Sequence, residues 1–268
     1  MTVVSPLPSA KTMIQPPTKA LATFAASLRG EDLPSRIVAS LGDLFLDYLR
    51  VASIGAEMPW SKWAHDYVDN LGRQGVAPVL FEAPGCDPVR SAFLNATYAG
   101  SIDADDTHVG SMLHPGAIVF SAALAIGNQV GARGNDFIAA VAAGYEAMIR
   151  VGLSIQPTHF HRGFQSTATC GGFGAAVTAS RLLFGRDTSP DQRIAEAIGL
   201  VASFSGGLTQ FYQSGSTVKR IHAARAAENV SGVYRFRLNT RSGRHLVINA
   251  SSAPARAASR CSPPARPP

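Results

Sequence analysis

Residues 116–127 read GAIVFSAALAIG and residues 137–148 read FIAAVAAGYEAM, and these two stretches decide the fold class. Each is apolar almost all round, so a helix built from it has to be covered by other helices on both faces. Their many Ala and Gly residues let neighbouring helices pack closely. The two stretches therefore predict a pair of fully buried core helices.

Apolar residues also recur at three- and four-residue steps on both sides of these stretches, as they do on one face of an amphipathic helix. One stripe runs from Leu21 to Leu28, and Pro34 opens a second segment whose apolar residues run from 37 to 49. Only residues 76–81 hint at a strand. The sequence therefore predicts an all-α, multi-helix domain. Further helices are expected at about 60–72, 88–101, 114–130, 135–153, 167–184, 190–205 and 216–229.

Three parts follow one another along the chain. Residues 1–17 hold four Pro and no periodicity, which predicts a flexible arm, and residues 18–230 form the all-helical domain. Residues 231–268 hold five Pro, seven Arg and no acidic residue. This basic tail is interpreted either as a disordered segment or as out-of-frame translation of a GC-rich gene, which tends to produce Arg, Pro, Ala and Ser. In neither case do we expect it to carry catalysis.

The charge distribution argues against binding to nucleic acid. The whole chain has a formal net charge of +6, but the first 230 residues carry 17 basic and 18 acidic groups. No cluster of Lys and Arg with interleaved aromatic residues occurs in that part of the sequence. Charged residues make up only 16% of the chain, against a usual value of about 25%, so much helix surface must be buried within the fold or in an oligomer.

Cysteine usage and the lengths of apolar runs bear on location. Cys86, Cys170 and Cys261 lie far apart, so we expect neither a disulfide framework nor a four-thiolate metal site, and the predicted location is the reducing cytoplasm. The N-terminus lacks the basic start and apolar run of a signal peptide. The longest apolar stretch, residues 116–127, is too short to cross about 30 Å of hydrocarbon. The sequence therefore predicts no membrane anchoring.

The densest polar cluster lies in residues 102–116, which hold three carboxylates and two imidazoles. Pro115 is well placed for the first turn of the next helix, so the cluster is expected to form a loop between rigid elements. Asp103 and Thr107 would share a face if the segment were helical. His114 would lie near a helix N-terminus, whose dipole disfavours imidazolium and favours bound anions. A neutral base beside an anionic substrate is one interpretation of this arrangement.

Two other interpretations of this cluster stay open. Asp105 and Asp106 can serve simply as caps of helix ends, with both His on the surface. A His, Asp and Asp set at this spacing can also hold a divalent ion, although no second set elsewhere in the sequence completes such a site.

Two further clusters carry polar groups that can bind anions. Residues 158–174 combine His, Thr and Ser with glycines at the expected start of a helix, where exposed N–H groups can receive a carboxylate, or where the glycines simply allow tight packing. Lys219 and His222 are three residues apart and would lie on one face of a helix. Such a lysine either binds a carboxylate and moves protons or is an ordinary solvated side chain. Cys170 is interpreted as a buried small residue.

These stretches, in this order, resemble the MmgE/PrpD family, which includes 2-methylcitrate dehydratase, cis-aconitate decarboxylase and iminodisuccinate epimerase. The resemblance covers about residues 18–230. It implies a large all-helical domain, a smaller α/β lid, a homodimer, and no metal, iron–sulfur cluster or organic cofactor. The motifs that carry it are Asp-x-Asp-Asp-Thr-His through His-Pro-Gly (103–116), Gly-Tyr-Glu (144–146), Gly-Phe-x-x-Thr-x-x-x-Gly-x-Phe-Gly-Ala (163–175), and Lys219 with the Ala-Ala-Glu-Asn that follows (226–229).

The resemblance also implies the site residues. Carried over by position, the catalytic residues are Asp103, Thr107, His114 and Lys219, and the expected substrate-binding residues are His108, His161, Gln165 and His222. Gln165 stands where the family usually has a histidine. A glutamine can hydrogen-bond a carboxylate but cannot take up a proton at neutral pH, and His161 is the nearby candidate to replace it.

The function implied is a lyase-type reaction on a small di- or tricarboxylate, in which a proton beside a carboxylate is removed and water or carbon dioxide is lost, or the centre is epimerised. The family's lid follows the position of Val230, and we expect little turnover from a chain without it. A non-catalytic helical remnant that dimerises or serves as a scaffold is the alternative, and a His/Asp metallohydrolase is a third hypothesis. The sequence does not choose the acid or the reaction.

Overall fold

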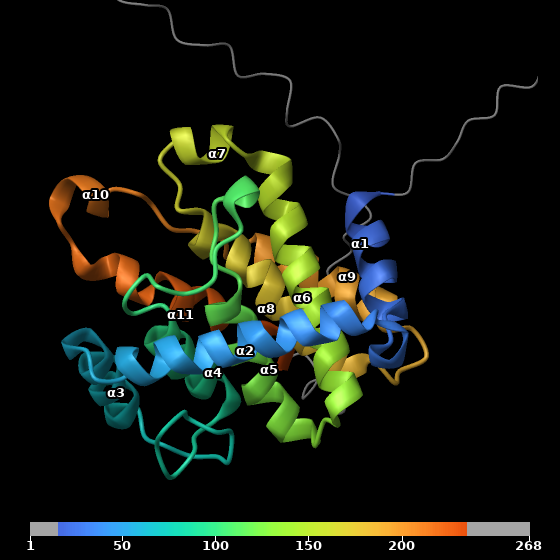
Figure 1. Cartoon of the computed structure of the whole chain (residues 1–268), viewed down its shortest axis with the longest axis horizontal. Helices are drawn as coiled ribbons and strands as arrows, with labels where there is room; N and C mark the ends of the chain where they lie inside the picture. The colour runs from blue at the N-terminus through green and yellow to red at the C-terminus, as the bar shows by residue number, and fades with distance from the viewer. Residues whose placement is uncertain (1–15, 235–268) are drawn as a thin grey trace, which may run out of the picture.

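The computed structural model describes residues 16–234, and these residues form a bundle of α-helices with short 3-10 helices between them (Figure 1). The predicted all-α fold is confirmed, since no strand occurs within residues 16–234. The α-helices are α1 (Pro17–Ser27), α2 (Ser35–Gly55), α3 (Pro59–Asn70), α4 (Pro88–Ala99), α5 (Gly116–Val130), α6 (Gly134–Ile155), α7 (Thr158–His161), α8 (Ser166–Phe184), α9 (Pro190–Ala202), α10 (Phe211–Ser214) and α11 (His222–Ala227). The 3-10 helices are η1 (Gly30–Asp32), η2 (Val109–Ser111) and η3 (Thr217–Ile221).

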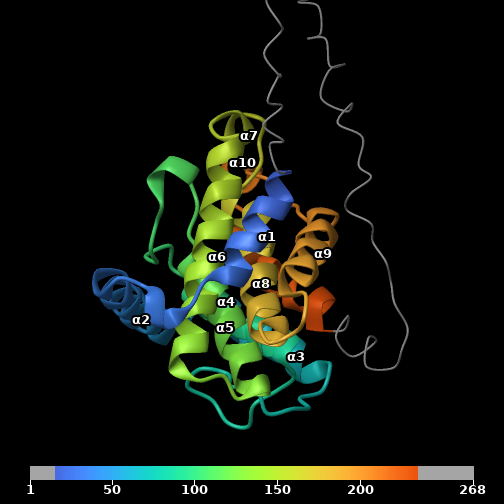
Figure 2. The same ribbon diagram turned by 90° about the vertical axis from the view of Figure 1, so that its right-hand side faces the viewer.

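The core is built around α5, α6 and α8, which lie in the middle of the bundle with α2 on one side and α9 on the other (Figure 2). Helix α8 is buried along nearly its whole length and packs against α5, α6, α9 and α11. Small residues allow the close approach that the sequence predicts. A Cβ atom at Gly144 would run into Thr178, and one at Gly171 would run into Ile118. The two apolar stretches therefore form the predicted core helices.

Helix α6 is 22 residues long and apolar enough, by length and composition, to cross a membrane. Half of its most apolar window is nevertheless buried inside the fold. It contacts α8, α5, α1 and η2, as the core helix of a packed domain does. The prediction of no membrane anchoring considered only the shorter apolar stretch in α5, and α6 is explained by packing within the domain.

The hint of a strand at residues 76–81 is wrong. This segment makes only an isolated bridge, between Ala77 and Cys86. Side chains of α4 bind its backbone instead: Asn95 Oδ1 accepts a hydrogen bond from the N–H of Leu80 at 2.8 Å, and Ser91 Oγ donates to the carbonyl of Pro78 at 2.6 Å. Because these polar groups are satisfied by a helix, no sheet partner is needed.

The single helix expected over residues 216–229 is also wrong. Gly215 adopts a left-handed conformation with φ of +65° and ends α10, and Ser216 then caps the short helix η3. The backbone changes again at Ile221, which ends η3 and is the N-cap of α11. The chain is helical again at residues 230–234, where Val230 and Val233 are buried. Most of the expected arm (residues 1–15) and of the expected tail (residues 235–268) lies outside the described residues.

Candidate functional site

The loop between α4 and α5 is fixed by Asp106. Its Oδ1 accepts a hydrogen bond from the N–H of Gly116 at 2.8 Å, and its Oδ2 accepts one from the hydroxyl of Tyr145 at 3.0 Å. Burial raises the pKa of Asp106, partly offset by these hydrogen bonds. The interpretation of Asp106 as a cap of the following helix, α5, is therefore confirmed. The Gly-Tyr-Glu motif contributes Tyr145, whose hydroxyl holds the carboxylate of Asp106 in place.

Two more contacts shape this loop. The N–H of His114 donates to Thr167 Oγ1 at 3.1 Å, which ties the loop to the start of α8. His108 caps η2, because its Nδ1 accepts from the N–H of Ser111 at 3.2 Å. The segment around Asp103 is not helical, and Asp103 itself has a φ of +59°. Asp103 and Thr107 consequently do not share a helix face; they meet at a common neighbour, the ring of His114.

Asp103, His114 and Lys219 form the centre of the candidate site. The Nε2 atom of His114 lies 3.6 Å from Asp103 Oδ1, and the ammonium of Lys219 is ion-paired with Asp103 Oδ2. The hydroxyl of Thr107 lies 3.1 Å from the Nδ1 atom of His114. Figure 1 shows how this comes about, since the green loop before α5 lies beside the orange segment between α10 and α11. The side chain of Lys219 is only 19% exposed, so it is not an ordinary solvated lysine.

Asp105 belongs to the same cluster, although the sequence analysis did not count it among the expected catalytic residues and offered a helix cap as its role. Its Oδ1 lies 3.4 Å from His114 Nδ1, and its side chain is 6% exposed against 41% for that of Asp103. Burial raises the pKa of Asp105 to about 6, against the opposing charge of His114. Burial also acts on Asp103, but the hydrogen bond and the charge of Lys219 outweigh it and lower the pKa of that carboxyl. Two neighbouring carboxyls are thus tuned in opposite directions, as at sites that move protons.

One group of described residues could hold a metal ion. Asp103, Asp105 and His114 each offer a ligand atom, and these atoms lie within 4.8 Å of one another. A divalent cation among them would lie beside the ammonium of Lys219, which already neutralises the carboxylate of Asp103. Like charges at such short range repel each other strongly. The donor set therefore suits an ammonium-paired carboxylate better than a metal centre.

The other expected site residues lie outside this cluster. Gln165 is buried, and its Oε1 caps α8 by accepting from the N–H of Ala168 at 2.6 Å. His161 is exposed at the end of α7. His222 starts α11 and is buried, and its pKa is lowered by burial and by the charge of Lys219. No hydrogen bond or ion pair in residues 16–234 joins these three side chains to Asp103 or His114. Substrate binding by these three residues and by His108 stays a prediction.

A model of the MmgE/PrpD N-terminal domain matches residues 19–234. The chain belongs to the MmgE/PrpD family. Among curated proteins, it is 28% identical over 221 residues to the cis-aconitate decarboxylase-like protein oryM of Aspergillus oryzae (strain ATCC 42149 / RIB 40), and 27% identical over 218 residues to the cis-aconitate decarboxylase of Aspergillus terreus. Each match covers 79% of this chain, and 45% and 44% of the two relatives. The chain spans less than half the length of these relatives.

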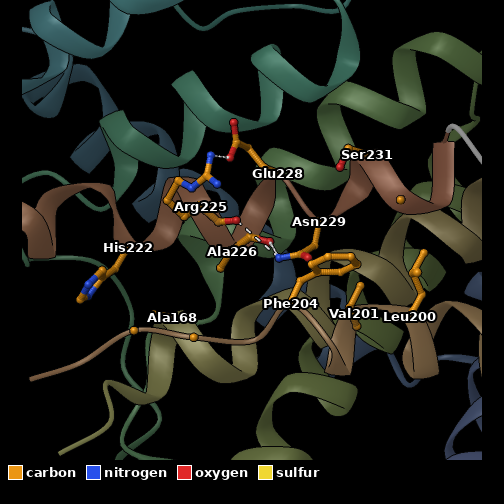
Figure 3. A pocket seen from close by; sticks show the side chains of 13 residues that line it. Ala168, Leu200, Val201, Phe204, His222, Arg225, Ala226, Glu228, Asn229 and Ser231 are labelled. Atoms are coloured by element: carbon orange, nitrogen blue, oxygen red, sulfur yellow. Dashed lines mark hydrogen bonds and ion pairs between the residues drawn. The ribbon is translucent and has the colours of Figure 1, made fainter.

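A pocket of about 660 Å³ lies elsewhere in this MmgE/PrpD domain, between α9 and α11 (Figure 3). Leu200 and Val201 line it from α9 and Phe204 from the turn that follows, and Arg225 and Glu228, which are ion-paired, line it from the other side. Of the expected site residues, only His222 contributes to its lining. Lys219 and His222 therefore face different regions, contrary to the expectation that they share one helix face, because η3 ends and α11 begins between them.

Proposed function

We propose that this MmgE/PrpD domain binds a small di- or tricarboxylate at the cluster of Asp103, His114 and Lys219, and that the cluster serves a lyase or epimerase reaction beginning at a carbon next to a carboxylate. One observation carries the proposal: residues separated by about a hundred positions place an ammonium, an imidazole and two carboxyls in direct contact. Membership of the family and similarity to proteins named cis-aconitate decarboxylases support it.

Lys219 is the group that neutralises the substrate. An incoming carboxylate either displaces Asp103 from the ammonium of Lys219 or binds to the ammonium together with Asp103. In both cases it gains a charge-assisted hydrogen bond. Because the lysine side chain is largely covered, its charge is screened less by water than that of a surface lysine. Charge that develops on the carboxylate as the adjacent carbon loses its proton is stabilised at the same place.

His114 is the group that moves the proton. Thr107 and Asp105 both lie at its Nδ1 atom, which orients the ring and leaves Nε2 as the atom on the side of Asp103 and Lys219. In dehydration, the C–H bond breaks, the proton passes to Nε2, and the remaining electron pair forms a double bond as hydroxide leaves the neighbouring carbon. In epimerisation, the carbon is protonated again on its other face. In decarboxylation, the C–C bond to a carboxylate breaks instead, carbon dioxide leaves, and the electron pair that remains on the carbon takes up a proton from Nε2 of protonated His114.

The names of the two relatives favour decarboxylation of cis-aconitate as the first reaction to test. The expected homodimer and the cytoplasmic location stay predictions beside this proposal. They are tested by the mass of the purified protein in solution and by its distribution between cell fractions.

Binding is tested by calorimetric titration of the purified chain with cis-aconitate, citrate and 2-methylcitrate. We expect Lys219→Ala to weaken binding of each bound acid by about tenfold or more. Lys62→Ala is the matched control, because Lys62 is an exposed lysine with a single ion pair to Glu57. Release of carbon dioxide and loss of water are then measured with the same three acids. A folded wild-type chain that ignores every acid would instead support the scaffold alternative.

A further inference from the structure

Arg220 follows Lys219 directly on η3, and its guanidinium lies over an aromatic ring. Its guanidinium carbon lies 5.1 Å from the centre of the Trp60 ring, a cation–π distance. Its Nη1 atom is buried, yet it has no hydrogen-bond partner among the described residues. A buried N–H group without an acceptor costs free energy that an incoming acceptor would recover. Arg220 is thus a positioned cation whose buried Nη1 N–H group lacks a hydrogen-bond acceptor among the described residues.

Trp60 is itself held firmly in place at the start of α3. Its Nε1–H donates to Ser101 Oγ at 2.6 Å, and Ser101 Oγ lies 2.7 Å from Ser61 Oγ. Both serines are fully buried. Ser101 also begins the loop that carries Asp103, so the same contacts place the indole ring and that loop. The position of the Arg220 guanidinium is therefore set by a buried network rather than by solvent.

The guanidinium also acts on the candidate site. After burial, Lys219 and His114, Arg220 is one of the groups whose charge shifts the pKa of Asp103, and it lowers it. Two cations on consecutive residues thus act on one carboxylate, but only Lys219 is paired with it. A guanidinium offers five N–H donors in a planar fork that matches a carboxylate better than any other common anion-binding side chain does.

We propose that Arg220 is a second carboxylate anchor, which selects substrates that carry at least two carboxylates. The inference rests on the proposed function, because Lys219 is taken to hold the first carboxylate. Trp60 is the platform that orients the anchor. An acid with one carboxylate would be held at Lys219 alone and would leave the Nη1 N–H group of Arg220 without an acceptor.

The test uses Trp60 as its own reporter. Trp63, the other tryptophan of the chain, is exposed, so Trp63→Phe leaves a single indole whose fluorescence reports on the face of Arg220. In this background, cis-aconitate and the monocarboxylate crotonate are titrated by fluorescence and calorimetry. We expect Arg220→Gln to weaken binding of cis-aconitate by about tenfold or more and that of crotonate by less than about twofold. Arg220→Lys keeps the charge but loses the planar fork. Its affinity for cis-aconitate should therefore lie between that of the background protein and that of Arg220→Gln.

Arg193→Gln is the matched control, since Arg193 also lies over an aromatic ring, that of Phe184, on a different helix. It should bind both acids as the background protein does. Circular dichroism checks that each variant is folded. If Arg220→Gln does not fold, the selectivity of Arg220→Lys for cis-aconitate over crotonate decides the test. Unchanged selectivity for cis-aconitate over crotonate in a folded Arg220 variant would overturn the anchor and leave the proposed function standing. Failure of the background protein to bind any carboxylate would overturn both.

Discussion

Two regions of this domain are candidate ligand-binding sites. The cluster around His114 is charged and partly buried, and its side chains come from a loop and a 3-10 helix that lie far apart in the sequence. The pocket beside Phe204 is a cavity of about 660 Å³, lined by apolar side chains and by an ion pair that is already satisfied. The cavity has room and is lined in part by His222, but the ammonium, the imidazole and the two carboxyls that contact one another lie in the cluster. Volume by itself therefore does not locate the chemistry.

The N-terminus of α8 lies between the two regions and forms the wall that separates them. Thr167 accepts a hydrogen bond from the backbone of His114 on one side, and Ala168 lines the pocket on the other. Neighbouring residues of one helix thus serve both regions. Substitutions on either side of this wall can show whether the regions are energetically separate.

The largest expected effect is on stability, at the anchor of the cluster. Asp106→Ala leaves the N–H of Gly116 and the hydroxyl of Tyr145 without their acceptor, and should lower the free energy of unfolding by about 3 kcal/mol. Glu228→Gln, which breaks the ion pair beside the pocket, should cost less than about 1 kcal/mol because Arg225 is well exposed. Urea denaturation measures both. Equal losses would mean that the two regions are built alike.

A second prediction concerns pH and Asp105. Its folded-state pKa is raised from 3.8 to about 6, so the folded protein binds more protons than the unfolded chain between these values. Stability from this group is therefore lost as the pH rises through that window. Relative to Asp105→Asn, the wild type should lose on the order of 2–3 kcal/mol between about pH 4 and pH 6. Asp187→Asn, at an exposed carboxylate, is the control for the change in charge. Parallel stability curves for wild type and Asp105→Asn would contradict the prediction.

A third prediction separates the two regions by ligand binding. Phe204 is 69% exposed and lines the pocket, so Phe204→Ala removes pocket wall with little cost to folding. Carboxylate affinity should then change by less than about twofold, against about tenfold or more for Lys219→Ala. Calorimetric titration with cis-aconitate gives both numbers. A large loss in the Phe204 variant would move the binding site to the pocket.

The smallest expected effect is at the wall between the regions. Gln165→His introduces the residue that the family usually has, but removes the side-chain oxygen that caps α8. We expect a loss of about 1 kcal/mol in the free energy of unfolding, as for other lost N-caps. Thermal denaturation measures it. An increase in stability would show that a histidine can replace the cap.

The candidate site was predicted only in part. The Asp-x-Asp-Asp-Thr-His run and Lys219 stood out in the sequence, and the structure brings Asp103, Thr107, His114 and Lys219 together. Asp105 was not counted among the expected catalytic residues, since nothing local distinguishes the carboxylate that burial will cover. Trp60 and Arg220 were not singled out, because the ring and the guanidinium are 160 positions apart and meet only through packing. Aromatic residues near basic ones in the sequence would not have revealed this pair.

The sequence by itself determined that α5 and α6 are helices and that they are buried, because a stretch that is apolar all round is stable only when neighbours cover it. It did not determine what residues 76–81 do, since their backbone groups are satisfied by Ser91 and Asn95 of α4. Only the tertiary structure decided that the cluster forms between the loop before α5 and the turn before α11. The physical reason is range: periodicity and caps act over a few residues, whereas burial and charge pairing depend on contacts that the packed helices alone create.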